Sequence, residues 1–313
     1  PVYEPPGGPG GLPLDLERFV RGLESRVGDR VDWYEAVRAL RFVRSYMDRV
    51  EDWWERGPGN DVPQVNAPYH NLGVYGADLL DVLLLDADRI AARLEKPSSD
   101  DPFVQVVDRD NDRAWRVVLE SCRAPDGTAR TVLDAARAMG DEGTIDGAAG
   151  PGIETLVVML GANHALGTVV DLDVRWTPDD YLDQPPEARL ASKGPFNVWQ
   201  PAHFAEEWGL LVDSLDAINA RHVVVATVPQ VTIAPIARGA HGKISRYSRY
   251  FRFYVRPWIA DDDFDRGRDA HLTADEARMV DSAIDEYNTT ITESVRTARQ
   301  SGRDWYLFDL GGL

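Results

Sequence analysis

The stretch ETLVVMLGANHALG, residues Glu154–Gly167, decides the fold that we predict for this chain. Its first half, Thr155–Leu160, is a continuous apolar run, which is typical of a parallel strand covered on both faces. The run stops at Gly161, Ala162, Asn163 and His164. Ligands of open α/β sheets bind at the carboxyl ends of the strands, so the Asn163 amide is well placed to donate to a ligand oxygen.

Helical and β-branched segments alternate through the second half of the chain. In order they are a helix over Ala202–Ala220, a strand over His222–Val228, a helix from Thr273 to about Ala298 and a strand at Trp305–Asp309. Thr273 and Glu276 form a capping box that opens the second helix. Strands separated by helices predict a doubly wound parallel sheet. We therefore expect an α/β protein with a three-layer α/β/α, flavodoxin-like fold and helical insertions.

The first half of the chain predicts mostly helices. The expected elements are helices at Leu14–Val27, Ala36–Arg56, Asp78–Leu94, Asp112–Ser121 and Thr128–Met139, a short strand at Tyr69–Val74, and a glycine-rich linker at Gly140–Gly152. We expect these elements to belong, with the second half, to one domain over residues 1–313.

Composition and charge exclude several classes of protein. The net charge of −18 argues against a nucleic-acid partner, because phosphates would repel the chain. No run of about 18 apolar residues occurs, so we predict no transmembrane segment. Cys122 is the only cysteine, which excludes an intrachain disulfide. The histidines lack the spacing of a zinc site, and we expect neither a metal nor a cofactor.

Two short motifs give the chain a family resemblance. The residues Asn71–Asp78, NLGVYGAD, resemble the second conserved block of the SGNH/GDSL hydrolases, and Gly161–His164 resembles their third block. The resemblance implies a serine ester hydrolase acting on a small-molecule, lipid or carbohydrate ester through an acyl-enzyme. It also implies that the Gly76 backbone N–H and the Asn163 side-chain amide donate to the oxyanion of the tetrahedral intermediate.

The chain also departs from the family pattern. It contains no Gly-Asp-Ser, it has no Asp-x-x-His near its end, and His164 stands where the third block usually carries Asp. By resemblance, the nucleophile should precede Pro1 and the Asp-His pair should follow Leu313. We therefore interpret the chain as a fragment that is incomplete at both ends and inactive as given. The alternative is a non-catalytic binding or scaffold domain that kept the hydrolase fold.

Each candidate residue has a structural alternative. Asn163 could satisfy the turn after its strand, and Gly76 could serve only to start a helix. His164 could act as a general base, although we favour a hydrogen bond to a nearby carboxylate such as Asp171 or Asp173.

The segment Gly239–Pro257 is dense in Arg, Tyr and Phe, and we predict that it is a loop. Its Ser245–Trp258 part could form a lid over a substrate, or an anion site made of Arg246, Arg249 and Arg252. We favour arginine side chains that stack on aromatic faces and anchor the loop.

Overall fold

The computed structural model describes residues 38–45, 68–94, 110–145, 148–149 and 152–312. The chain divides into two compact units, one made of Pro1–Gly76 and Leu85–Ala135, the other of Ala77–Leu84 and Ala136–Leu313. The single domain expected over residues 1–313 stays a prediction.

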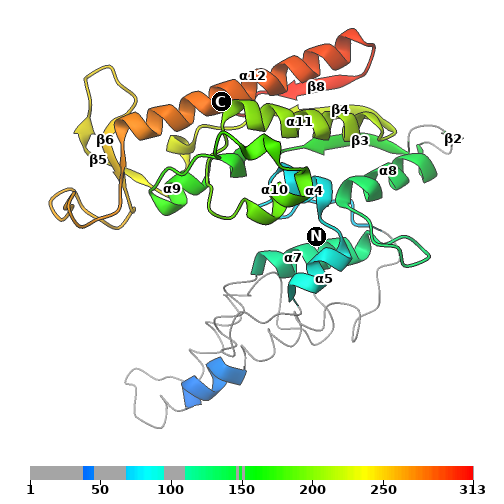
Figure 1. Cartoon of the computed structure of the whole chain (residues 1–313), viewed down its shortest axis with the longest axis horizontal. Helices are drawn as coiled ribbons and strands as arrows, with labels where there is room; N and C mark the ends of the chain where they lie inside the picture. The colour runs from blue at the N-terminus through cyan, green and yellow to red at the C-terminus, as the bar shows by residue number, and fades with distance from the viewer. Residues whose placement is uncertain (1–37, 46–67, 95–109, 146–147, 150–151, 313) are drawn as a thin grey trace. The chain divides into compact units, whose positions relative to one another are not determined.

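The second unit contains a parallel three-stranded sheet in the order β3-β4-β8 (Figure 1). Its strands are β3 (Ile153–Val158), β4 (Ala220–Ala226) and β8 (Trp305–Phe308). The register aligns Val157 with Val224, and Val224 with Tyr306. The α/β class, the parallel direction and the positions of all three strands agree with the sequence-based expectation.

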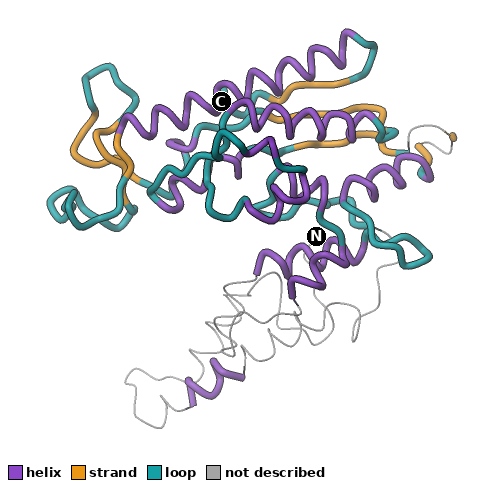
Figure 2. Tube along the Cα trace, viewed as in Figure 1, coloured by secondary structure: helices purple, strands orange, loops and turns teal. Residues whose placement is uncertain are grey.

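Two long helices, α11 (Pro201–Asp216) and α12 (Ala274–Gln300), pack together along one side of this sheet (Figures 1 and 2). The predicted capping box opens α12: the Thr273 N–H donates to Glu276 Oε2 at 2.7 Å, and the Glu276 N–H donates to Thr273 Oγ1 at 3.3 Å. The Trp208 indole of α11 donates to Ser294 Oγ of α12 at 3.1 Å. The local sequence pattern therefore predicted both helices correctly.

The prediction that the β3 strand is covered on both faces is wrong. Val157 and Met159 are each 60% exposed. Tyr306 and Phe308 of β8, which lie on the same face of the sheet, are each 44% exposed. Within the described residues β3 is an edge strand with β4 as its only neighbour in the sheet. Side chains alternate between the two faces of a strand, so Val157 and Met159 point to the exposed face and Val158 to the buried one.

The prediction of a loop over Gly239–Pro257 is wrong, because this segment supplies two strands of a second sheet. Strands β5 (Arg238–Lys243), β6 (Phe251–Val255) and β7 (Leu272–Thr273) pair antiparallel. Ala240, Val255 and Phe264 form a small core beneath the β5–β6 hairpin. Phe251, Phe253 and Tyr254 of the expected loop are therefore strand residues, which pleated pairing accommodates well.

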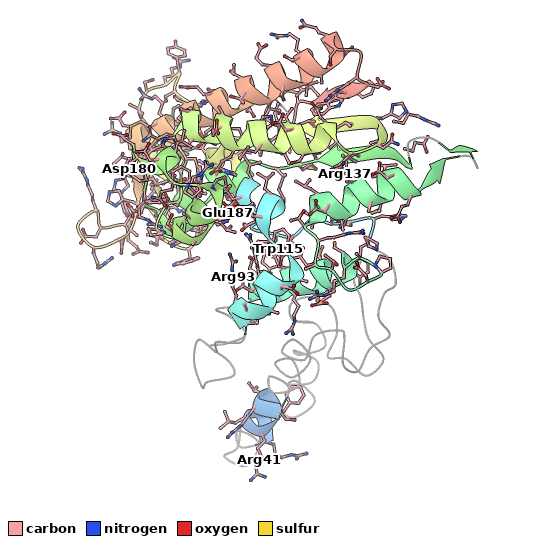
Figure 3. All side chains as sticks on the ribbon, turned by 45° about the vertical axis from the view of Figure 1, so that its right-hand side comes forward. Arg41, Arg93, Trp115, Arg137, Asp180 and Glu187 are labelled. Atoms are coloured by element: carbon pink, nitrogen blue, oxygen red, sulfur yellow. The ribbon has the colours of Figure 1, made fainter. Side chains whose placement is uncertain are left out.

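Helices α5 (Ala87–Leu94) and α7 (Asp110–Ser121) pack against each other in the first unit. Ile90 and Trp115 are fully buried, and Trp115 is labelled in Figure 3. Residues 38–45 are also helical, within the predicted helix at Ala36–Arg56. The predicted helix at Leu14–Val27 lies outside the described residues.

Two expectations for the first half are wrong. Residues Tyr69–Val74 form no strand and lead into a turn at Tyr75 and Gly76. The helix expected over Asp78–Leu94 is two helices, α4 (Leu79–Leu84) and α5, because Leu85 and Asp86 interrupt it. The Asp86 carboxylate accepts the Arg89 N–H at 2.8 Å, which starts α5 as a new helix.

The remaining elements are short, apart from α8. They are α8 (Val132–Glu142), β1 (Thr144–Ile145), β2 (Ala148–Ala149), η1 (Ala162–His164), α9 (Gly167–Asp171), η2 (Tyr181–Asp183), α10 (Pro186–Ser192) and η3 (Val231–Ile233). None of the helices among the described residues is both long and apolar enough to cross a bilayer.

Candidate functional site

The turn after β3 positions Asn163 at the carboxyl end of the parallel sheet. Gly161 makes this turn with φ of 109°. A Cβ at Gly161 would lie 2.7 Å from Val228 Cγ2 and 3.3 Å from the Phe204 ring. Both the torsion and the close packing require glycine here. The chain then enters η1, which carries Asn163 and His164.

The Asn163 side chain is half-buried and has one hydrogen-bond partner among the described residues. Its Nδ2 donates to the main-chain carbonyl of Ala77 at 2.6 Å. A carboxamide NH₂ carries two N–H groups, so this bond uses one of them. The other N–H has no partner in the part of the chain that the structure describes.

Gly76, the second predicted donor, lies in an exposed turn of the first unit and has φ of +74°. The Asn111 side chain donates to the carbonyl of Tyr75 in the same turn. A Cβ at Gly76 would lie 3.2 Å from Asn111 Nδ2. Gly76 precedes Ala77 directly in the chain, but the convergence of its N–H with the Asn163 amide stays a prediction.

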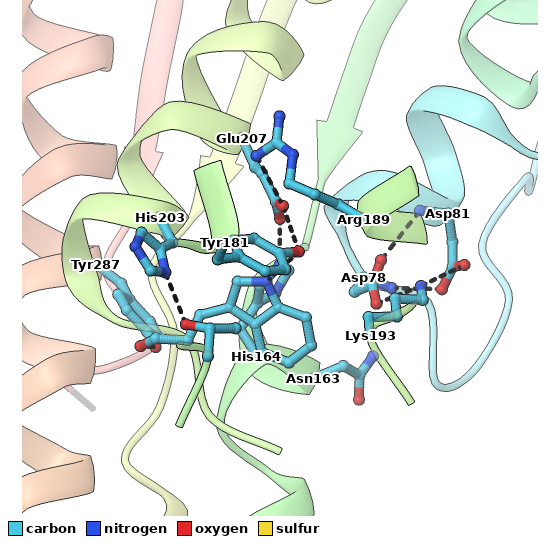
Figure 4. Close-up of polar contacts among 12 residues, drawn as sticks. Asp78, Asp81, Asn163, His164, Tyr181, Arg189, Lys193, His203, Glu207 and Tyr287 are labelled. Carbon is cyan, nitrogen blue, oxygen red and sulfur yellow. Dashed lines mark hydrogen bonds and ion pairs between the residues drawn. The ribbon is translucent and has the colours of Figure 1, made fainter. Parts of the chain in front are cut away.

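Asp78 and Asp81 form an acidic pair at the start of α4, directly after Ala77. The Asp78 N–H donates to Asp81 Oδ2 at 3.1 Å, and the Asp81 N–H donates to Asp78 Oδ1 at 3.0 Å, so the two residues cap the start of α4 reciprocally. Lys193, which follows α10, donates to both carboxylates and lies 2.6 Å from Asp81 Oδ1 (Figure 4). The cluster is largely buried, with the Lys193 side chain 17% exposed.

The pKa values of the two carboxyls shift in opposite directions. Burial raises the pKa of Asp78, but the Lys193 and His164 charges, with hydrogen bonds from Lys193 and the Asp81 N–H, together outweigh burial and hold that pKa below the usual value. Burial and repulsion from Asp78 raise the pKa of Asp81, and Lys193 only partly offsets them. Two neighbouring carboxyls that share one cation are expected to separate in this way.

His164 is fully buried, and its partner is Glu207 of α11, which is also fully buried. The His164 Nε2 lies 3.5 Å from Glu207 Oε2, and the ring meets the edges of Trp199 and Phe204 at centroid distances of 4.8 and 5.2 Å. The expected partners, Asp171 and Asp173, instead bind Arg175. A ring without exposed surface cannot reach a substrate, so the general-base alternative for His164 has no support in the structure.

Glu207 is the centre of a buried polar network that the sequence did not reveal (Figure 4). The Tyr181 hydroxyl donates to Glu207 Oε1 at 2.7 Å, and Arg189 Nη1 lies 3.3 Å from the same oxygen. The Trp199 indole donates to the Tyr181 hydroxyl at 3.1 Å. Burial, followed by the Glu207 charge, raises the pKa of Tyr181, which therefore remains a donor. The network reaches the turn that carries Asn163 through His164, the next residue, which lies 3.5 Å from Glu207.

The carboxyl ends of β4 and β8 are tied together at the same edge of the sheet. Thr227 Oγ1 donates to Asp309 Oδ1 at 3.0 Å and accepts the Gly311 N–H at 2.8 Å. The Asn288 side chain of α12 binds the Val228 N–H and carbonyl at 2.7 and 2.8 Å. At the edge of the sheet that carries Asn163, these hydrogen bonds therefore hold the backbone at the ends of β4 and β8 in place.

Two of the alternatives for the Arg/Tyr segment can be weighed from its contacts. Arg249, a member of the expected anion site, donates to Gln230 Oε1 and the Tyr250 hydroxyl, both at 2.6 Å, and lies 3.8 Å from Asp281. Arg246 and Arg249 stack on Tyr247 and Tyr250 at 5.8 and 4.9 Å. Arginine–aromatic stacking is therefore present, and Arg249 already faces a carboxylate.

Comparisons of the chain with protein-family models, with curated proteins and with solved structures find no match. Within the described residues, no group of three or more His, Cys, Asp or Glu side chains is arranged to hold a metal ion. The case for a function therefore depends on the geometry around Asn163.

Proposed function

We propose that this chain carries the oxyanion-binding part of an SGNH/GDSL-type serine ester hydrolase. The observation that carries the proposal is the Asn163 amide, which sits at the carboxyl end of β3 and binds Ala77 with only one of its two N–H groups. A fixed neutral donor with one free N–H at this edge suits an oxygen that gains negative charge during acyl transfer.

In the proposed reaction, a serine hydroxyl attacks an ester carbonyl, and an acyl-enzyme forms and is hydrolysed by water. The free Asn163 N–H and the Gly76 backbone N–H donate to the oxyanion, together with the N–H of the serine. The serine and the Asp-His pair lie outside residues 1–313. The complete protein has a three-layer, flavodoxin-like sheet, and its substrate is a small-molecule, lipid or carbohydrate ester.

The second candidate is a non-catalytic binding or scaffold domain with the same fold. Two observations favour it: the 313 residues contain no Gly-Asp-Ser, and the bond from Asn163 to Ala77 by itself gives the amide a structural role.

Labelling with a fluorophosphonate probe distinguishes the two functions. We expect the complete protein, with its flanking sequence, to be labelled covalently at one serine, and the 313-residue chain to remain unlabelled. Prior treatment with phenylmethylsulfonyl fluoride should block the labelling. A complete, folded protein that takes up no probe would support the scaffold function instead.

A further inference from the structure

The β5–β6 hairpin concentrates positive charge in a strongly acidic chain. The segment 243–256 contains no acidic residue and five basic ones, Lys243, Arg246, Arg249, Arg252 and Arg256, whereas the whole chain has a net charge of −18. We call residues 243–252, which connect β5 to β6 and include the first residues of β6, the hairpin tip.

The hairpin tip presents both apolar and cationic side chains to solvent. Tyr247 is 91% exposed and Ile244 is 41% exposed. Lys243, Arg246 and Arg252 are exposed as well, and none of the three has a carboxylate partner among the described residues. Exposed apolar side chains flanked by unpaired cations are typical of segments that lie in the interface of a membrane.

Some residues of the hairpin anchor it, so its exposed side chains project from a fixed support. Tyr250 and Tyr254 are buried, and Arg249 joins the hairpin to Gln230 in the loop after β4. On α12, the fully buried Asp281 accepts a hydrogen bond from Thr232 at 3.0 Å and lies 3.8 Å from Arg249. Arg249 thus serves the anchor and Arg256 donates to the Val170 carbonyl, whereas Lys243, Arg246 and Arg252 remain available.

We propose that the hairpin tip binds the surface of a bilayer that contains anionic lipids. Lys243, Arg246 and Arg252 contact lipid phosphates, while Tyr247 and Ile244 enter the headgroup region. The acidic residue Asp261 accepts the His241 N–H of β5 at 3.0 Å, and Arg238 pairs with it at 2.6 Å. Acidic charges more than about 8 Å from the tip are largely screened at physiological salt. Ile244 favours a bilayer over an acidic polymer, since an aliphatic side chain gains free energy only where it leaves water. The proposal does not depend on the proposed ester hydrolase function.

Cosedimentation of the full chain with vesicles tests the proposal. We expect binding to vesicles of phosphatidylcholine mixed with phosphatidylglycerol, weaker binding at high salt, and no binding to phosphatidylcholine alone. The triple variant K243Q/R246Q/R252Q should lower the partition constant on the order of a hundredfold. The matched control R221Q/R296Q/R299Q removes three exposed arginines elsewhere and should bind like the unmodified chain.

The apolar contact needs a separate variant, I244S/Y247S, which keeps every charge. It should bind more weakly than the unmodified chain, and thermal melts should show that all variants remain folded. The proposal is overturned if the folded chain does not bind the mixed vesicles, or if the triple variant binds them as well as the control. Binding to heparin without binding to vesicles would identify an acidic polymer as the partner and would also overturn it.

Discussion

The side-chain amide of Asn163 donates a hydrogen bond to the main-chain carbonyl of Ala77, 86 positions earlier in the chain, at 2.6 Å. The bond ties the turn after β3 to the residue that precedes the Asp78–Asp81 cap of α4. The same side chain therefore has a structural contact and, among the residues that the structure describes, one N–H without a partner, and the two roles separate experimentally.

Replacing Asn163 with alanine should affect catalysis far more than stability. The loss of one hydrogen bond should lower the free energy of unfolding by about 1 kcal/mol. The loss of an oxyanion donor should lower kcat in the complete protein by roughly 10²–10³. Denaturant unfolding and steady-state hydrolysis of p-nitrophenyl acetate measure the two effects. An Asn163→Ala protein with unchanged kcat would remove Asn163 from the proposed mechanism.

Glu207 should be essential for stability because it is fully buried against Arg189 and His164. Glu207→Ala leaves the buried Arg189 without its carboxylate, and we expect a loss of about 3–5 kcal/mol in the free energy of unfolding. Its neighbour Glu206 is exposed on the same helix and provides the control. Glu206→Ala should change stability by about 0.5 kcal/mol or less. Equal effects of the two substitutions in urea unfolding would contradict the network described here.

Gly161 and Gly209 form a matched pair of glycine substitutions with opposite expected signs. Gly161→Ala combines φ of 109° with a Cβ 2.7 Å from Val228, so we expect destabilisation of about 1–3 kcal/mol. Gly209 lies in α11, and a Cβ there meets nothing within 4 Å. Gly209→Ala should therefore stabilise the protein by about 0.5–1 kcal/mol. The two melting temperatures should shift in opposite directions. A Gly161→Ala protein with an unchanged melting temperature would contradict the strained turn.

Lys193→Met should destabilise the protein in a pH-dependent manner. The variant leaves Asp78 and Asp81 buried together without their cation, at an expected cost of about 2–4 kcal/mol near neutral pH. The Asp78 pKa is lowered in the folded protein, so its contribution is present above the unfolded pKa and is lost as the pH falls.

The Asp81 pKa is raised, so ionised Asp81 costs stability, and that cost disappears as the pH falls through its folded pKa. Without Lys193, the pKa values of both carboxyls should rise. The difference in unfolding free energy between the unmodified protein and the variant should therefore shrink between pH 7 and pH 4. Lys243→Met, at an exposed site, is the control. A difference that stays constant with pH would contradict the shared cation.

Local patterns predicted much of the fold. The Thr273–Glu276 capping box and the helical spacing that follows it predicted α12. Each of these signals depends only on residues three or four positions apart in the chain. The β-branched run at His222 predicted β4. The same local reasoning failed for the β5–β6 hairpin, where the pairing partner of each strand decides whether an Arg/Tyr-rich segment is a loop or a sheet.

The candidate site was predicted only in part. The end of the apolar run identified Asn163, but no sequence signal pointed to its bond with Ala77. Lys193 is one of only three lysines, yet its two aspartates are 115 and 112 positions away. Partners at such separations cannot be read from spacing, because only the folded chain brings them together.

The sequence by itself determined the α/β class, the parallel strands and the place of Asn163 at a strand end, since apolar periodicity and capping are properties of neighbouring residues. The tertiary structure alone decided that His164 is a buried partner of Glu207 and that β3 exposes one face. Burial and pairing depend on which distant segments pack together. They arise from contacts that form only when the chain folds.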